Sequence, residues 1–458
     1  MSPSGRTVAR IGVGAVGIVA ALGVGAAVGL VQLPELVEAS PSVSVDPQPA
    51  DQRRACTGGV LVGQGTDGES FSTTGGTRLH AAPENAASTP LDGFNVDGDD
   101  AGRVVLRSAA EVAMAGALSQ SVDQDGMLGL VTSSCAPARA ENWLVAGSGE
   151  TGRSAVIVLS NPGETDASVD MSFFAESGEL EAPGATGIIV PAGQTRAMPL
   201  SAFVSSVQLP VVQVVARGSQ ISASIQSTST RGLDPAGVDI SGATAAASTR
   251  QTIAGLVIPD NVGKTEGEEF DDIEPGVRIF APHADSATVT VTVSKDGDGA
   301  QPPQELRVVD GVVAEAMLGA LDAGEYSVVV ESDVPVVAAV RTTVRDGDTS
   351  EYAWTTAASP LSDLTAIAVP AAVDARLHVF NPGETGTEVT LVDRRGDERV
   401  LTIAAGDQAS LRVDAGADYQ LIGSDVVASI SAVSDDGIAS SPVYPASSGA
   451  GSLTVYPH

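Results

Sequence analysis

The sequence contains few aromatic side chains: two tryptophans, five tyrosines and eight phenylalanines among 458 residues. Proteins that bind sugar rings or single-stranded bases usually stack them on exposed aromatic rings. The scarcity of rings therefore disfavours both ligand classes. Five of the largest rings provide a test, because exposed rings would favour sugar binding and buried rings a structural role: Trp143, Trp354, Tyr326, Tyr352 and Tyr419.

Basic residues are also scarce, with 24 lysines and arginines against 57 acidic residues and a net charge of -33. Binding to nucleic acid or to anionic lipid headgroups needs a basic surface. The acidic residues are dispersed rather than gathered in long blocks, which is typical of a soluble, self-repelling surface. We therefore expect no nucleic-acid partner.

The residues that carry most hydrolytic chemistry are nearly missing. The four histidines form no His-x-x-x-His or His-Glu pair, so a zinc site or a histidine-dependent triad has little to build on. A Gly-x-Ser-x-Gly elbow and a phosphate-binding Gly-x-x-x-x-Gly-Lys loop are also missing. We expect a protein that is not an enzyme and has no cofactor. Glycoside hydrolysis by paired carboxylates is the alternative, because such pairs occur on many folds.

Three acidic segments raise the alternative of calcium binding, because Ca²⁺ takes several oxygen ligands from one short loop. They are Asp92–Asp100, Glu266–Glu274 and residues 296–298. None of them has the full EF-hand spacing, and Asp-Gly pairs are also common in hairpin turns. Turns or solvated loops are the simpler interpretation, and we expect no metal site.

One long apolar run lies near the N-terminus, where residues 11–31 include no charged side chain. As a helix, such a run spans roughly 30 Å, the thickness of the hydrocarbon layer. Arg6 and Arg10 precede it and acidic residues follow it. The positive-inside rule therefore predicts a single-pass membrane protein with residues beyond about 35 outside the cytoplasm. A cleaved signal peptide is the alternative.

Only two cysteines are present, Cys56 and Cys135. In an exported chain, two cysteines most simply form one disulfide. This bond requires the strand that begins at Cys56 to run beside the segment before Trp143. Two separate buried thiols are the alternative.

The pentapeptide Asn-Pro-Gly-Glu-Thr occurs twice, at residues 161–165 and 381–385. In both places an apolar run precedes it, and a run that alternates apolar and polar residues follows it, as expected of two strands. Proline fixes φ at the second position of a turn, and glycine suits the positive φ of a type II turn. We therefore expect structural turns at Asn161, Pro162 and Gly163, and at Asn381, Pro382 and Gly383.

A degenerate third copy lies at Pro282, between "GVRIF" and "ATVTVTV". The copies stand about 100–120 residues apart, and each unit holds six or seven short strands. This pattern predicts an all-β chain of tandem immunoglobulin-like β-sandwich modules. A β-propeller-like fold is the alternative, although propeller repeats are only about 40–50 residues long.

The expected domain order follows from these signals: a cytoplasmic N-terminus (1–10), a transmembrane signal-anchor (11–33), a stalk (34–54), a disulfide-bracketed β region (55–141), three sandwich modules (142–240, 250–350 and 352–440) and a C-terminal tail (441–458).

The segment "SSCAPARAENWLVAGSGETGRSAVIVLSNPGETDASVDMSFF" combines a Cys-Pro-rich turn, a Trp-x-x-x-Gly start, an Asn-Pro turn and an alternating strand. This combination resembles a family of uncharacterised, membrane-anchored exported proteins of actinobacteria, described as a domain of unknown function. The resemblance covers roughly residues 55–440 and implies no catalytic residues. Repeats, a membrane anchor and a stalk without a catalytic constellation favour a structural or interaction protein of the cell envelope, with an envelope protein or polysaccharide as partner. A polysaccharide-binding module and, less favoured, a glycoside-active enzyme are the alternatives.

Overall fold

The computed structural model describes residues 43–45, 51–64, 70–98, 102–109, 112–124, 126–259, 274–282, 284–309, 311–346, 349–372, 374–434, 437–446 and 453–455. The expected N-terminus, signal-anchor and most of the stalk lie outside these residues. Within the described ranges, no helix is long and apolar enough to cross a membrane.

The chain divides into two compact units. In the first, β1 (Val43–Val45) pairs antiparallel with β37 (Leu453–Val455). The second unit, residues 48–449, holds every other strand and is built from β-sheets with one short 3-10 helix, η1 (Leu200–Ala202), among its described residues. The all-β prediction is therefore confirmed.

The first of three similar modules consists of two sheets, ordered β12-β18-β14-β15 with β16 beside β14, and β20-β19-β13-β17. Its strands are β12 (Glu141–Leu144), β13 (Arg153–Ser160), β14 (Ala167–Ala175), β15 (Gly178–Leu180), β16 (Ile188–Val190), β17 (Gln194–Pro199), β18 (Val211–Arg217), β19 (Ser222–Arg231) and β20 (Asp234–Gly242). Alternation along β14 buries Val169, Met171 and Phe173 in the core between the sheets.

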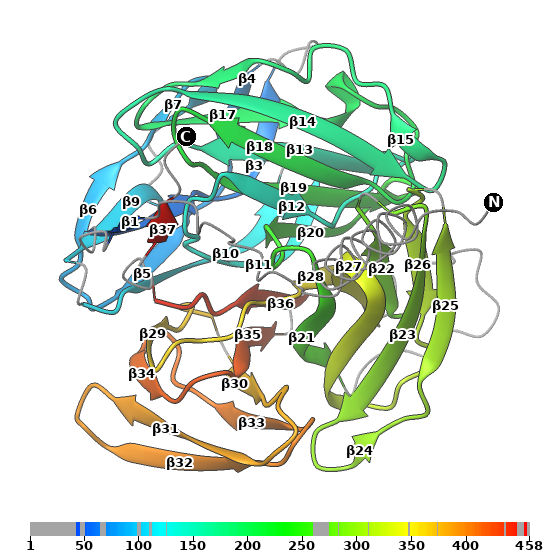
Figure 1. Cartoon of the computed structure of the whole chain (residues 1–458). Helices are drawn as coiled ribbons and strands as arrows, with labels where there is room; N and C mark the ends of the chain where they lie inside the picture. Colours follow the sequence, from blue (N-terminus) through cyan, green and yellow to red (C-terminus); the bar gives the residue numbers. More distant parts are fainter. Residues whose placement is uncertain are drawn as a thin grey trace, which may run out of the picture. The chain divides into compact units, whose positions relative to one another are not determined.

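The second and third modules repeat this order (Figure 1). The second pairs β21-β27-β23-β25 and β26-β22-β27-β28, with one long strand, β27, serving both sheets, and the third pairs β29-β34-β31-β32 and β33-β30-β35-β36. The second contains β21 (Ser248–Ile258), β22 (Gly276–Phe280), β23 (Ser286–Lys295), β24 (Gly299–Ala300), β25 (Gln304–Val309), β26 (Ala314–Met317), β27 (Gly324–Asp346) and β28 (Thr349–Thr356). The third contains β29 (Leu364–Ala368), β30 (Ala375–Phe380), β31 (Thr387–Asp393), β32 (Glu398–Ile403), β33 (Gln408–Arg412), β34 (Asp418–Ile422), β35 (Val427–Ser434) and β36 (Gly437–Pro442). Each module thus contributes two sheets, whereas a propeller blade contributes one.

The N-terminal region forms a less regular fourth unit with sheets β11-β10-β5, β2-β9-β6 and β3-β4-β8. Its strands are β2 (Gln52–Thr57), β3 (Leu61–Gln64), β4 (Ser70–Thr73), β5 (Arg78–Ala82), β6 (Ala87–Pro90), β7 (Asp92–Gly93), β8 (Val96–Asp97), β9 (Arg103–Ser108), β10 (Ala115–Gln124) and β11 (Met127–Ser134). Two of these sheets, β11-β10-β5 and β2-β9-β6, have three strands in the same order as part of the two sheets of a module. Pro83 comes shortly after the end of β5, as the repeated prolines come shortly after the ends of β13, β22 and β30.

The last strands of the four units, β11, β20, β28 and β36, contact one another in a closed cycle, which we call the hub. The carboxylate of Glu351 on β28 lies in the hub, where it accepts backbone N–H groups of Leu130 on β11 (2.6 Å) and Ile438 on β36 (3.1 Å). The neighbouring positions on β11 and β36 are glycines, Gly129 and Gly437, where any Cβ would collide with this carboxylate. The hub therefore joins three units through one buried side chain.

Three expected boundaries are wrong. The boundary at 350–352 falls inside β28, because this strand pairs with the end of β27 and completes the second module. The stalk ends before residue 52, since Gln52–Thr57 pairs with β9 and buries Arg54. The boundary at 440–441 falls inside β36, and beyond this strand Val443 is buried and Arg54 donates a hydrogen bond to the carbonyl of Pro445.

Candidate functional site

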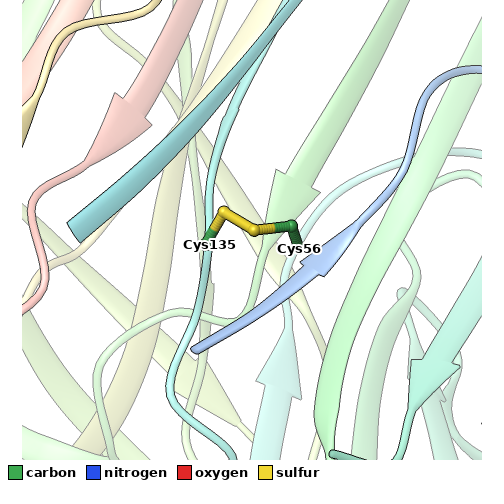
Figure 2. The surroundings of a disulfide bond; sticks show 2 residues. All are labelled: Cys56 and Cys135. Atoms are coloured by element: carbon green, nitrogen blue, oxygen red, sulfur yellow. A yellow bond between two sulfur atoms is a disulfide. The ribbon is translucent and has the colours of Figure 1, made fainter. Parts of the chain in front are cut away.

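The disulfide between Cys56 and Cys135 is present, with a Cα–Cα distance of 4.2 Å across a sequence separation of 79 (Figure 2). Ala55 and Ala136 exchange both backbone hydrogen bonds, each 2.9 Å long. The strand that contains Cys56 thus runs beside the segment after β11, as the sequence predicts. The bond joins β2, the first strand of the N-terminal unit, to the residue that directly follows its last strand, β11.

The repeated Asn-Pro-Gly turns lie between β13 and β14 and between β30 and β31, but they are not type II turns. Neither Gly163 nor Gly383 has positive φ. Instead, the Asn161 Oδ1 atom accepts the Gly163 N–H (2.9 Å), and its Nδ2 donates to the carbonyls of Thr165 (2.8 Å) and Val190 (2.9 Å). An asparagine side chain that bonds the backbone two residues on is an Asx turn.

The second copy has the same bonds, from the Gly383 N–H to Asn381 Oδ1 (2.9 Å) and from Asn381 Nδ2 to the Thr385 carbonyl (2.8 Å). Both asparagines are buried. Pro282 occupies the corresponding place between β22 and β23, after an alanine instead of an asparagine. These residues close inter-strand turns. The asparagine side chains bond to their own module, and the Pro162 carbonyl accepts a hydrogen bond from Arg53 Nη1 of the N-terminal unit (3.4 Å).

All five large rings are buried, with exposed fractions between 1% for Tyr326 and 8% for Tyr352. Trp143 packs 5.8 Å from Phe280, and Phe280 lies 4.4 Å from Phe174, measured between ring centroids. Phe280 belongs to the second module and the other two rings to the first. The rings therefore help to hold neighbouring sandwiches together.

A cavity of about 180 Å³ opens between the first and second modules, and we call it the arginine pocket. Its lining includes three arginines and one glutamate together with hydroxyl groups and two rings: Gly147, Ser148, Arg153, Gln208, Leu209, Ser227, Thr228, Ser229, Arg278, Glu315, Met317, Arg341, Tyr352 and Trp354. Strands β13 and β19 supply one wall, and β22, β26, β27 and β28 supply the other.

Arg278 is the most deeply buried cation of the pocket, 2% exposed. Its Nη1 donates to the carbonyls of Gly147 (2.9 Å) and Pro210 (3.1 Å) across the module interface. Its guanidinium lies 4.4 Å from the ring centroid of Trp354, a distance suited to cation–π attraction. Its Nε has no hydrogen-bond partner among the described residues.

Glu315 is the carboxylate that two of the arginines share. Its oxygens lie 3.5 Å from an Arg278 nitrogen and 3.2 Å from an Arg341 nitrogen. The pKa of Arg278 is lowered to about 10, mainly by burial and also by the charges of Arg341 and Arg153, while the Glu315 carboxylate opposes the shift. Arg278 and Arg341 are therefore held close together by one shared carboxylate.

A buried carboxyl contacts the backbone of Trp354. Asp239 accepts the Trp354 backbone N–H (3.4 Å) and the hydroxyl of Ser241 (2.5 Å). Burial raises the pKa of Asp239 to about 7. At neutral pH this carboxyl contributes only part of a negative charge.

One strand position has a different role at each module interface. This position lies two residues before the last residue of the strand that precedes the proline turn. The residues at this position are His80 on β5, Val158 on β13, Arg278 on β22 and His378 on β30. His378 bonds the hydroxyls of Ser410 (2.8 Å) and Ser431 (2.7 Å), and burial lowers its pKa to about 3. His80 Nε2 forms a hydrogen bond with the Asp418 carboxyl of the third module, and Val158 packs among apolar side chains.

Sequence reasoning did not find the arginine pocket, because its charged residues are spread from residue 153 to residue 341. The one local signal was Arg278 inside the apolar run "GVRIF", where a charge is unexpected in a buried strand. The acidic segments expected as alternatives for calcium fall partly outside the described residues. Where the chain is described, no group of three or more potential metal ligands occurs.

Comparison with known proteins gives a family but no activity. No curated protein matches the sequence. The structure of Thermotoga maritima 1070 is 15% identical, and the match covers 24% of this chain and 93% of that chain with a TM-score of 0.21. The Anabaena sensory rhodopsin transducer is 20% identical over 20% of this chain and 95% of that chain, with a TM-score of 0.18. The FN1-FN3 domains of chicken CNTN1 are 8% identical over 68% of this chain and 94% of that chain, with a TM-score of 0.09.

The sequence model of one family matches residues 72–416, which is most of the chain. This range includes the second half of the N-terminal unit, the first two modules and most of the third. The chain therefore belongs to DUF5719, a family of unknown function.

Proposed function

We propose that this chain is a non-enzymatic interaction protein of an actinobacterial cell envelope, anchored by residues 11–33 and exported beyond about residue 35. The observation that carries the proposal is the burial of all five large rings inside or between sandwiches. Rings used in this way are not available for stacking on a polysaccharide, so a polysaccharide-binding module and a glycoside-active enzyme are less well supported. The disulfide agrees with an oxidising compartment.

An apolar row on the third module is the surface that we assign to partner binding. Leu364, Ile422, Thr390 and Val400 lie opposite one another across β29, β34, β31 and β32. Residues paired in this way point to the same face of a sheet. Val400 is 59% exposed and Ile422 47% exposed, whereas neighbouring Leu421 is fully buried on the opposite face. Three of the four residues are apolar and exposed, and exposed apolar residues gathered on one face are typical of protein-binding surfaces.

Crosslinking in intact cells, followed by purification of the chain, tests this proposal. We expect a defined protein adduct that is lost in the double variant Val400→Asp/Ile422→Asp. The matched control is Val309→Asp, because Val309 is also an exposed strand residue but lies in the second module. An adduct unchanged in the double variant, or retention of the purified chain by envelope polysaccharide, would count against the proposal.

A further inference from the structure

A small cavity of about 20 Å³ lies between the N-terminal unit and the third module, and we call it the Arg54 cavity. Its polar lining residues are Arg54 on β2, Ser134 at the end of β11 and Tyr444 after β36. Apart from the disulfide-bonded Cys135, the other described lining residues are apolar or glycine, and none is acidic. The cavity therefore offers hydrogen-bond donors in an otherwise apolar setting.

Arg54 is a buried guanidinium without a carboxylate partner among the described residues. It is 1% exposed, its Nη2 donates to the carbonyl of Pro445, and its buried Nη1 has no hydrogen-bond partner in the described part of the chain. By contrast, Arg278 and Arg341 share the carboxylate of Glu315. Because burying a charge is costly unless the charge is paired, Arg54 has the chemistry of a site for a counter-ion.

A second guanidinium adds to the positive charge near the cavity. The guanidinium carbon of Arg139 lies 5.8 Å from the ring centroid of Tyr444, and Arg139 Nη1 donates to the carbonyl of Thr244 (3.1 Å). The pKa of Arg54 is lowered to about 10, mainly by burial; Tyr444 opposes this shift and the charge of Arg139 adds to it. No carboxylate of the described residues is among the groups that shift this pKa, and Arg54 keeps its charge at neutral pH.

The size of the cavity limits its ligand to one small particle. A buried water needs about 10–15 Å³, so about 20 Å³ suits a particle slightly larger than water but not a polyatomic oxyanion such as sulfate. The hydroxyls of Ser134 and Tyr444 can donate hydrogen bonds to an anion, as a guanidinium does. Burial raises the pKa of Tyr444, so its hydroxyl keeps its proton at neutral pH. Both residues are half-buried, which leaves a route for exchange with solvent.

From this geometry we infer that the Arg54 cavity binds one halide ion, chloride under physiological conditions, between the N-terminal unit and the third module. The ion would accept hydrogen bonds from Arg54 Nη1 and from the hydroxyls of Ser134 and Tyr444, and it would neutralise a charge that has no carboxylate partner. Arg54 belongs to the first strand of the N-terminal unit, and Tyr444 follows the last strand of the third module. Chloride would therefore join distant parts of the chain, independently of the apolar row on the third module.

Crystallography of the full chain with bromide in place of chloride locates the ion directly, because bromine scatters X-rays anomalously. We expect an anomalous peak in the Arg54 cavity, within hydrogen-bond distance of Arg54 Nη1. A water in the cavity without an anomalous peak would overturn the inference, and so would bromide bound at exposed arginines alone.

Thermal unfolding of the full chain tests the same site in solution. Replacing sodium gluconate by sodium chloride at constant ionic strength should raise the melting temperature until the rise saturates, since a ligand of the folded state stabilises it. Arg54→Gln should abolish the saturable rise. Arg196→Gln is the control, because Arg196 also donates to a backbone carbonyl, that of Ile189, but lies outside the cavity. A saturable rise that persists in Arg54→Gln, or that is lost equally in Arg196→Gln, would contradict the inference.

A milder variant keeps the test decisive if Arg54→Gln does not fold. Ser134→Ala removes one donor to the ion and leaves the guanidinium in place. The chloride concentration at half of the rise should increase about tenfold, which corresponds to the loss of one hydrogen bond to a charged group. An unchanged half-point in Ser134→Ala would contradict the proposed coordination of the ion.

Discussion

The carboxylate of Glu351 fills the space beside Gly437 so closely that a Cβ added at this glycine would lie 1.0 Å from Glu351 Oε2. Gly437 has φ of 151°, a backbone conformation that favours glycine. The last strands of the second and third modules, β28 and β36, are therefore in contact where the Glu351 carboxylate fills the space that a side chain at Gly437 would occupy. The relationship makes the hub sensitive to changes at either residue.

Glu351→Gln should lower the free energy of unfolding less than Glu351→Ala. The glutamine keeps one oxygen acceptor, whereas alanine leaves the N–H groups of Leu130 and Ile438 buried and unpaired. Each unpaired buried group costs about 1–3 kcal/mol, so for the two groups we expect roughly 2–6 kcal/mol for alanine. Chemical denaturation of both variants measures their free energies of unfolding and so tests which variant is less stable. Equal stability of Glu351→Ala and the unchanged protein would show that the hub does not hold the units together.

Gly163→Ala should cost more stability than Gly383→Ala, although both glycines stand in the same pentapeptide. A Cβ at Gly163 would lie 2.1 Å from Ser219 Oγ, whereas the nearest atom at Gly383 is Asn381 Oδ1, at 3.0 Å. The difference should be about 1–3 kcal/mol, as for other overpacked sites. Thermal unfolding compares the two variants.

Adding Ser219→Ala to the Gly163→Ala variant is the control for this comparison. Removing the hydroxyl should recover part of the loss in Gly163→Ala, although Ser219 also donates a hydrogen bond to Asn161 (2.9 Å). If Gly383→Ala were the more damaging change, steric crowding at Ser219 would not explain the glycine at position 163.

Reduction of Cys56–Cys135 should destabilise the N-terminal unit. Closing a loop of this length removes unfolded-state entropy worth about 4–5 kcal/mol in the chain-entropy model. The melting temperature should therefore fall with reductant in the unchanged protein, and the Cys56→Ser/Cys135→Ser variant should show no response to reductant. Thiol titration of the denatured, unreduced protein should find no free thiol; two free thiols per chain would contradict the bond.

Acid should destabilise the third module through His378. Its folded pKa of about 3 lies below the usual value of 6.5, so the unfolded chain takes up a proton first as the pH falls. Stability is therefore lost between about pH 6.5 and pH 3, by about 2 kcal/mol at pH 5. The free energy of unfolding lost between pH 7.5 and pH 5 should be smaller by this amount in the His378→Gln variant than in the unchanged protein. An identical loss in both proteins would show that His378 is not the group that titrates.

The sequence patterns predicted the strands and the repeat better than the joints between them. Alternation in "ASVDMSFF" reports which face of β14 is buried, because side chains alternate along a strand, and the two cysteines had only each other as partners. By contrast, β28 looked like the start of the third module, since its pairing with β27 depends on a partner strand and not on its own pattern. The Asx turn was missed because the same Asn-Pro-Gly letters also suit a type II turn.

The arginine pocket lay beyond prediction for a related reason. Arg153 and Arg341 come together only because two sandwiches pack against each other, and nothing in the neighbouring residues of either arginine records this contact. The five rings illustrate the same limit: their number was evident from the sequence, but their burial inside and between modules required the structure.

Export from the cytoplasm is the claim on which the proposed function most depends, and cysteine labelling in intact cells tests it most directly. Leu233 is 96% exposed in the turn between β19 and β20, so Leu233→Cys offers an accessible thiol. We predict that a membrane-impermeant maleimide labels Leu233→Cys in intact cells but labels Ser4→Cys only after lysis. Labelling of Leu233→Cys only after lysis would contradict the account.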